Sequence, residues 1–317
     1  HLEEDAWPKA NPLQGVKLPR LQSLPKNVTE RWPVARPDLL SATGDDASVA
    51  HLAIDHDVAS VRGRNGGFRA AESTLDAFLT DRLPAYNETR NHPEKESTSQ
   101  LSPYLHFGNI SSHQVLDAVL TRDDWSLDKL GEKVTGKFVG WWGAAETTEA
   151  FLDELITWRE LGYNMTSQTD DYDQYASLPD WARKTLDEHR DDRREYVYSL
   201  PQFDQAETHD SLWNAAQNQL RRDGRIHNYL RMLWGKKILH WSESPERALA
   251  TMIELNNKYA LDGRDPNSYS GIFWVLGRYD RAWGPERPIF GKIRYMTSDS
   301  TRSKYRVNNY VRLYAQP

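Results

Sequence analysis

The segment from Arg225 to Trp241 is the most informative part of the chain, because of the side chains that it brings together. Asn228, Arg231 and Met232 are separated by three and four positions, so a helix would present them on one face. A buried guanidinium needs an acidic partner, since an unpaired buried charge is very costly, and Asp262 is the candidate. The sequence therefore predicts an amide, a guanidinium and a thioether side by side, next to a carboxylate.

A second segment, from Thr98 to Gly108, reads Thr-Ser-Gln-Leu-Ser-Pro-Tyr-Leu-His-Phe-Gly and clusters hydroxyl groups just before a predicted helix. Hydroxyls and free backbone N–H groups in such a place suit a pyrophosphate, because both direct donors at the anion. As a pattern alone, however, a run of this kind is more often only a helix cap and turn.

Two further groups of residues contain tryptophan side chains whose spacing could serve a function. Glu154 and Trp158 are four positions apart, so on a helix the carboxyl could hydrogen-bond a base on which the ring stacks. Trp234 and Trp241 lie two helical turns apart, and Trp213 lies on the preceding predicted helix. Indoles in van der Waals contact can relay an electron in short hops. Spacing alone favours an ion pair beside a core Trp for the first group and core packing for the second.

The elements that must position these residues are predicted to be helices. Residues 1–65 are rich in proline and polar residues and predict a linker or wrapping arm, whereas residues 66–317 predict one mainly α-helical domain. Pro245 suits the first position of a helix, with Ser244 as its N-cap. Apolar residues recur at helical spacing in Phe68–Pro84, Ser111–Leu120, Thr147–Leu161, Trp181–His189, Leu212–Arg222, Arg225–Trp241 and Pro245–Tyr259.

Composition excludes several classes of protein. The chain has no cysteine, which excludes disulfides, thiolate metal sites and cysteine nucleophiles and is compatible with the cytoplasm. It has no apolar run long enough to span a membrane, and its histidines lack metal-ligand spacing, so neither a membrane nor a metal is expected. The net charge is −6, yet residues 221–237 hold six Lys/Arg against one Asp. Such a patch could contact nucleic-acid phosphates, and an ordinary solvated helix face explains it equally well.

The order of these motifs resembles the FAD-binding domain of the DNA photolyase/cryptochrome family, most closely the class II photolyases. The Thr98–Gly108 segment is similar to the family's FAD-phosphate loop almost residue for residue, and the tryptophans match the class II electron-transfer chain. The electron-transfer chain of class I photolyases would instead need a tryptophan at the position of Ile272. The resemblance covers roughly Gly66 to the C-terminus. It implies an all-helical fold for this region. The family's N-terminal α/β antenna domain is expected to be absent from this chain, either lost or removed or lying upstream of His1, so this chain is not expected to bind an antenna chromophore.

The resemblance also implies roles for individual residues. Those implied to contact FAD are Tyr86, Thr98, Ser99, Gln100, Leu101, Ser102, Arg159, Asn228, Arg231, Asn256, Asp262 and Gly263. Those implied to act in catalysis are Glu154, Arg231, Asn256 and Asp262. Those implied to bind the damaged bases are Glu154, Trp158, Asn228, Met232 and Trp274. The electron-transfer chain would run from Trp234, nearest the flavin, through Trp213 to Trp241. Lys292 and Arg294 would contact DNA.

The implied activity is light-driven repair of cyclobutane pyrimidine dimers in UV-damaged DNA, by electron transfer from reduced FAD. Such an enzyme is a carbon–carbon lyase, and we expect a monomer. The alternative is a cryptochrome-like blue-light photoreceptor that binds FAD without repair. Retention of Glu154, Trp158, Met232 and Trp274 favours repair, because a sensor does not need lesion contacts. A flavin-free helical interaction protein is a third possibility, which the colour of the purified protein would test.

Overall fold

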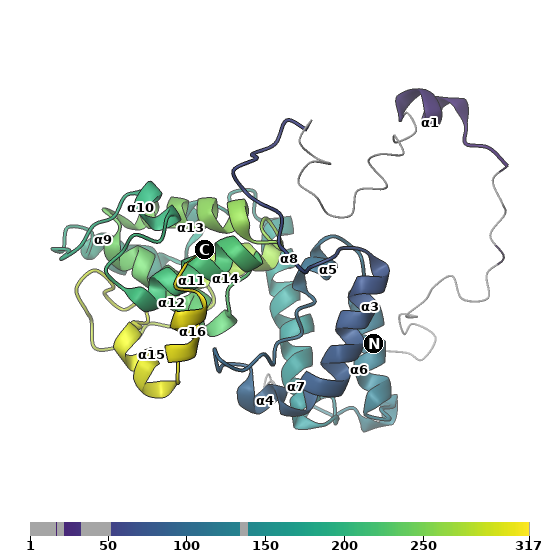
Figure 1. Cartoon of the computed structure of the whole chain (residues 1–317). Helices are drawn as coiled ribbons and strands as arrows, with labels where there is room; N and C mark the ends of the chain where they lie inside the picture. Colours follow the sequence, from purple (N-terminus) through teal and green to yellow (C-terminus); the bar gives the residue numbers. More distant parts are fainter. Residues whose placement is uncertain (1–16, 18–21, 33–51, 134–138, 317) are drawn as a thin grey trace.

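The computed structural model describes residues 17, 22–32, 52–133 and 139–316, and these are mainly helical (Figure 1). Among them there is no strand, and β pairing is limited to an isolated antiparallel bridge between Arg287 and Gly291. The predicted mainly α fold is therefore confirmed. Much of the predicted N-terminal arm, residues 1–16, 18–21 and 33–51, lies outside the described residues; within it, Lys26–Arg31 forms helix α1.

The N-terminal helices surround a first hydrophobic core, which includes Phe78, Leu83, Leu101 and Leu152. They are α3 (Phe68–Ala77), η3 (Phe78–Arg82), η4 (Leu83–Ala85), α4 (Tyr86–Thr89), α5 (Ser102–His106), α6 (Ser112–Arg122), η5 (Leu127–Lys129), α7 (Glu146–Leu152) and η6 (Asp153–Trp158).

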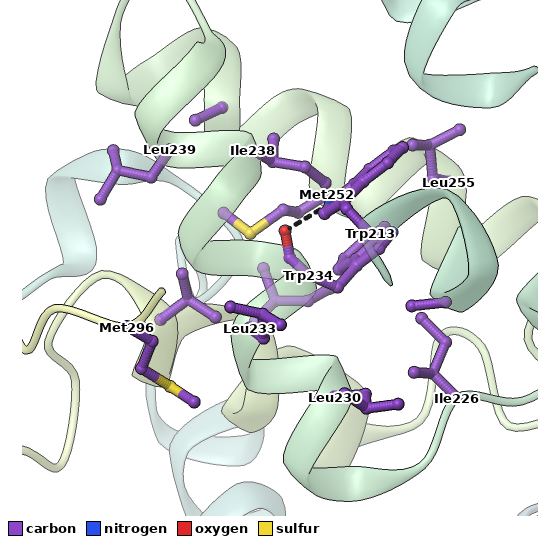
Figure 2. Packing of buried hydrophobic residues seen from close by; sticks show 14 of the residues in the cluster. Trp213, Ile226, Leu230, Leu233, Trp234, Ile238, Leu239, Met252, Leu255 and Met296 are labelled. Carbon is purple, nitrogen blue, oxygen red and sulfur yellow. Dashed lines mark hydrogen bonds between the residues drawn. The ribbon is translucent and has the colours of Figure 1, made fainter. Parts of the chain in front are cut away.

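The C-terminal helices surround a second core, which includes Trp213, Trp234 and Met252 (Figure 2). They are η7 (Tyr175–Ser177), α9 (Asp180–Glu188), α10 (Leu200–Asp204), α11 (Ser211–Asp223), α12 (Asn228–Trp241), α13 (Pro245–Tyr259), α14 (Pro266–Val275), α15 (Ser298–Lys304) and α16 (Asn308–Leu313). The two groups lie side by side in Figure 1, and α8 (Arg159–Gln168) joins them by packing against α14.

Local sequence chemistry accounts for the ends of the helices that carry the site. Ser244 accepts a hydrogen bond from the backbone N–H of Arg247, as its predicted role as an N-cap requires. Helix α11 ends at Gly224, whose φ of 62° is left-handed and favours glycine. A short turn then leads into α12, which begins at Asn228 rather than at the predicted Arg225.

The predicted continuous helix over Thr147–Leu161 is instead α7, a π-helical segment (η6) and α8. Helices α1, α4, α5, α10, α14, α15 and α16 were not predicted, because their sequences lack a clear apolar period. None of the helices in the described part of the chain combines the length and the apolarity that a bilayer crossing requires.

Candidate functional site

A cavity of about 590 Å³ lies between the two groups of helices, and residues of both cores line it. This volume is within the usual range for a small-molecule or cofactor site, roughly 300–1,000 Å³. Most of the predicted site residues line it together: Tyr86, Thr98, Ser99, Gln100, Ser102, Glu154, Trp158, Arg159, Asn228, Arg231, Met232, Asp262, Trp274 and Arg294.

The hydroxyl-rich loop lines one part of this cavity together with two arginines. Gln100 has a left-handed φ of 59° and accepts a hydrogen bond from Arg64 Nη2 at 2.9 Å. Arg225 forms a bidentate ion pair with Glu96, at 3.0 and 2.5 Å, and also faces the cavity. Burial is the main reason that the pKa of Arg64 is lowered, and the nearby Arg225 adds to it.

Hydroxyls beside guanidinium groups are a donor set that suits a diphosphate. Sequence reasoning missed both arginines. Arg64 falls in the segment predicted to be a linker, and Arg225 was predicted only as the start of a helix. The donors of this part of the cavity thus come from segments that are more than 100 residues apart in the chain.

The predicted pair of Arg231 and Asp262 is present. Arg231 Nη2 lies 3.8 Å from Asp262 Oδ1, and the two side chains are only 21 % and 17 % exposed. The Ser102 hydroxyl donates to the other carboxylate oxygen of Asp262, so this carboxylate joins the two groups of helices. A second link, between His106 Nδ1 and Asp265 Oδ2 at 3.2 Å, lies nearby.

Three residues with predicted cofactor roles do not line the cavity with their side chains. Leu101 is fully buried in the first core, and Asn256 is buried on α13. Gly263 packs against backbone, since an added Cβ would lie 2.9 Å from the carbonyl oxygen of Ala260. Close packing explains glycine at this turn. The roles of all three at the cofactor remain predictions.

The predicted lesion-binding residues form another part of the cavity wall. Glu154 and Trp158 lie on the π-helical η6, and Trp274 lies on α14. The rings of Trp158 and Trp274 lie 4.5 Å apart between centroids, at an angle of 39°. Trp158 Nε1 donates to Asp153 Oδ2 at 3.0 Å, which fixes the ring plane. The pair presents a tilted aromatic surface beside a carboxyl group.

Arg90 holds the Glu154 carboxyl group, a contact that sequence reasoning missed. Arg90 Nη1 lies 2.8 Å from Glu154 Oε1, and its guanidinium lies 5.4 Å from the centroid of the Tyr86 ring. The four-residue spacing of Tyr86 and Arg90 was the available clue. Burial raises the pKa of Glu154, although Arg90 opposes this effect. Burial, helped by the charge of Glu154, raises the pKa of Tyr86 to about 12, so this phenol stays neutral.

The predicted basic contacts are placed differently from one another. Arg159 lines the cavity but donates from Nη2 to the Tyr163 hydroxyl at 2.8 Å. Lys292 lies outside the cavity lining and pairs with Glu286 at 3.2 Å. Arg294 lines the cavity and lies 5.2 Å from the ring of Trp283. The basic run at residues 221–237 is not one solvated face, because both of its lysines, 236 and 237, are buried.

The three relay tryptophans belong to the second core, and Figure 2 labels two of them, Trp213 and Trp234. Trp234 follows the turn of α12 that lines the cavity with Arg231 and Met232. Trp213 Nε1 donates to the backbone oxygen of Trp234 at 3.0 Å, and the rings of Trp213 and Trp241 lie 6.1 Å apart. All three are at most 2 % exposed. The rings of Tyr198 and His209 cover Trp241, at 5.7 and 5.0 Å. Trp213 thus contacts the ring of Trp241 and the backbone of Trp234. The relay itself and the order of its three indoles remain predictions.

Two histidines lie on α12 or at its start. His227 is buried at the cavity wall, and His240 lies against Phe290 with 5.4 Å between ring centroids. Burial lowers the pKa of each to about 4, so both imidazoles are neutral at physiological pH.

Comparison with known proteins gives several close relatives, although no protein-family model matches the chain. The chain is 42 % identical over 246 residues to the deoxyribodipyrimidine photo-lyase of Methanothermobacter thermautotrophicus, covering 78 % of this chain and 50 % of that protein. It is 41 % identical over 252 residues to the protein of the same name from Oryza sativa subsp. japonica, covering 78 % and 46 %. The chain spans about half the length of the curated relatives that it matches.

Solved structures of more distant proteins share the fold. A bacterial class III photolyase from Agrobacterium tumefaciens has a TM-score of 0.54 at 21 % identity, covering 78 % of this chain and 44 % of that chain. A cryptochrome from Synechocystis has a TM-score of 0.55 at 18 % identity, covering 80 % and 46 %. These matches place the helices of this chain in a known helical architecture.

Proposed function

This chain belongs to the DNA photolyase/cryptochrome family, and on that premise we propose that it repairs cyclobutane pyrimidine dimers in UV-damaged DNA by light-driven electron transfer from reduced FAD. One observation carries the proposal. A single cavity holds both the donor set that suits a diphosphate and the carboxyl–indole surface of Glu154, Trp158 and Trp274. A cofactor and two linked, damaged bases would therefore meet inside it.

The residues of the cavity fit FAD. The hydroxyls of Thr98, Ser99 and Ser102, with Arg64, would hold its diphosphate, and the Arg231–Asp262 pair would lie beside its ring system. When bound in its reduced state, FAD supplies an excited-state electron donor after absorbing light. The protein supplies position and electrostatics.

The other cavity residues would receive the lesion. Photolyases belong to the enzymes that extrude their target nucleotides from the duplex. Trp158 and Trp274 would stack on the extruded bases, a contact worth about 1–3 kcal/mol per base. Glu154, held by Arg90 and raised in pKa by burial, would hydrogen-bond the dimer and steady the charge that it gains. Met232 and Asn228 complete this surface.

We assign the chain to the class II type and propose that Trp234, Trp213 and Trp241 restore the reduced cofactor under light. The support is that all three lie in the second core, that Trp213 contacts the Trp241 ring and the Trp234 backbone, and that Trp234 follows the cavity-lining Arg231 and Met232 on α12. They would not take part in each repair cycle, because the electron given to the dimer returns after the ring opens.

Illumination of dimer-containing oligo-dT with wild-type, Glu154→Ala and Trp234→Phe proteins tests these assignments. Glu154→Ala should slow repair directly, by about 10²–10³-fold if it stabilises developing charge. Trp234→Phe should block photoreduction and yet leave chemically reduced enzyme active. If Trp234→Phe lowered repair by chemically reduced enzyme as much as it lowered photoreduction, the relay would be contradicted.

The same experiment separates repair from the photoreceptor alternative. Normal photoreduction of bound flavin without any dimer cleavage by the wild type would reject the repair function and favour a cryptochrome-like sensor. A colourless purified protein that takes up no added FAD would reject both.

A further inference from the structure

We propose that Gln217 is a positioning residue of the tryptophan relay, and that it keeps the indole proton on Trp234 while that ring is oxidised. The inference rests on the proposed function, because it needs the relay. Trp234 Nε1 donates to Gln217 Oε1 at 2.9 Å, and the two residues are 2 % and 0 % exposed. Among the described residues, Gln217 is the hydrogen-bond acceptor of this indole.

The orientation of the Gln217 amide is fixed by its second contact. Its Nε2 donates to the backbone oxygen of Asp204 at 3.3 Å. A carbonyl can only accept and an indole N–H can only donate, so the amide has one orientation that satisfies both. The carboxylate of Asp204 is itself held by Lys258 and Tyr259, at 3.2 and 2.6 Å. The acceptor oxygen therefore points at Trp234 before any electron moves.

A neutral acceptor suits an inner step of a relay. In photoreduction Trp234 would give one electron to photoexcited oxidised flavin, which is the oxidant, and become a radical cation. The N–H of such a cation is far more acidic than that of neutral indole. If the proton left, the remaining neutral radical would be a weaker oxidant and would draw an electron from Trp213 less readily. The Gln217 oxygen stabilises the positive charge by its dipole but is too weak a base to take the proton.

The next indole has the same kind of partner. Trp213 Nε1 donates to the backbone oxygen of Trp234 at 3.0 Å, which is again a neutral amide oxygen (dashed line in Figure 2). Trp241 differs, because the imidazoles of His209 and His240 lie 5.0 and 6.4 Å from its ring. Each inner hop then moves one electron and breaks no bond, so the hole can pass outward to Trp241.

The first test is Gln217→Met, which keeps the length of the side chain and removes the acceptor. Transient absorption of the FAD-loaded protein should show a yield of separated tryptophan radicals about tenfold lower, as expected when a hydrogen bond to a charged group is lost. The matched control is Asn218→Leu on the same helix, since Asn218 donates to the Tyr314 backbone oxygen at 3.0 Å and, among the described residues, accepts no hydrogen bond from a relay indole. A wild-type yield in Gln217→Met, or an equal loss in Asn218→Leu, would overturn the proposal.

The second test is Gln217→Glu, which is nearly isosteric and remains informative if the first variant does not fold. Once ionised, the introduced carboxyl group can accept the indole proton. The spectrum should then change from that of the Trp234 radical cation to that of the neutral radical, and steady-state photoreduction should slow. A radical cation of wild-type lifetime beside an ionised carboxylate would refute the role of Gln217. Absence of any tryptophan radical in the wild type is a different failure, that of the relay itself.

Discussion

Replacement of Lys236 by Met should stabilise the protein near neutral pH. Lys236 is fully buried on α12, and its Nζ donates to the backbone oxygen of Val275 at 2.5 Å. Among the described residues it forms no ion pair. Burial is the main reason that its pKa falls from 10.5 to about 7, with Asp280 opposing the change and Arg294 adding to it.

The size of the effect follows from the two pKa values. In the unfolded chain Lys236 is protonated below pH 10.5, whereas in the folded protein it is protonated only below about pH 7. The difference, 10.5 − 7, corresponds to a cost of folding of about 4–5 kcal/mol below pH 7, which disappears as the pH rises towards 10.5. Met removes this cost but leaves the Val275 oxygen without its donor, which costs about 1–3 kcal/mol. The net gain at neutral pH should be about 1–4 kcal/mol.

Urea unfolding of wild type and Lys236→Met at about pH 6.5 and about pH 9.5 measures this gain, which should shrink at the higher pH. Lys237→Met is the matched control. Lys237 is also buried, but its Nζ lies 3.8 Å from Asp210 Oδ2, so its removal leaves a carboxylate unpaired and should not stabilise. An advantage of Lys236→Met that is equal at both pH values would refute the reasoning.

Three further substitutions test the site and its support. Gly235→Ala should lower the melting temperature, because the new Cβ would lie 2.5 Å from a Val275 methyl carbon. Such overpacking costs about 1–3 kcal/mol, which exceeds the gain of about 1 kcal/mol in helix propensity. Asp262→Asn should weaken FAD binding about tenfold or more, measured by equilibrium titration, because it removes the charged partner on the cavity wall; unchanged affinity would count against that pair. Arg90→Gln should raise the pKa of Glu154 further, so the pH profile of binding to dimer-containing DNA should move to higher pH, and an unshifted profile would exclude this carboxyl as the titrating group.

Periodic patterns in the sequence predicted the parts of the fold that depend on local chemistry. The helix over Pro245–Tyr259 and its Ser244 cap are as expected, because capping needs only the residues at the helix end. The grouping of Asn228, Arg231 and Met232 at the cavity followed from helical spacing in the same way. Spacing within a helix is a local property, so it can be read from the chain.

What could not be predicted depends on contacts between distant segments. Arg90 and Glu154 are 64 residues apart, and nothing in either segment indicates that they meet. Lys236 and Lys237 belong to a basic run whose charge indicated a solvated or phosphate-binding face, yet tertiary packing buries both. Arg64 reaches the cavity from a stretch that has no helical pattern of its own.

The π-helical segment η6 makes the site sensitive to the length of the chain as well as to its side chains. A π-turn amounts to one residue inserted into an α-helix, and each inserted residue turns everything beyond it by about 100°. Helix α8, which follows, is locked against α14 at Gly162, where even a methyl group would lie 2.9 Å from Ser270 Oγ. Deletion of a single residue from η6 would therefore force either Glu154 and Trp158 out of alignment or α8 off its neighbour, although every functional side chain would still be encoded.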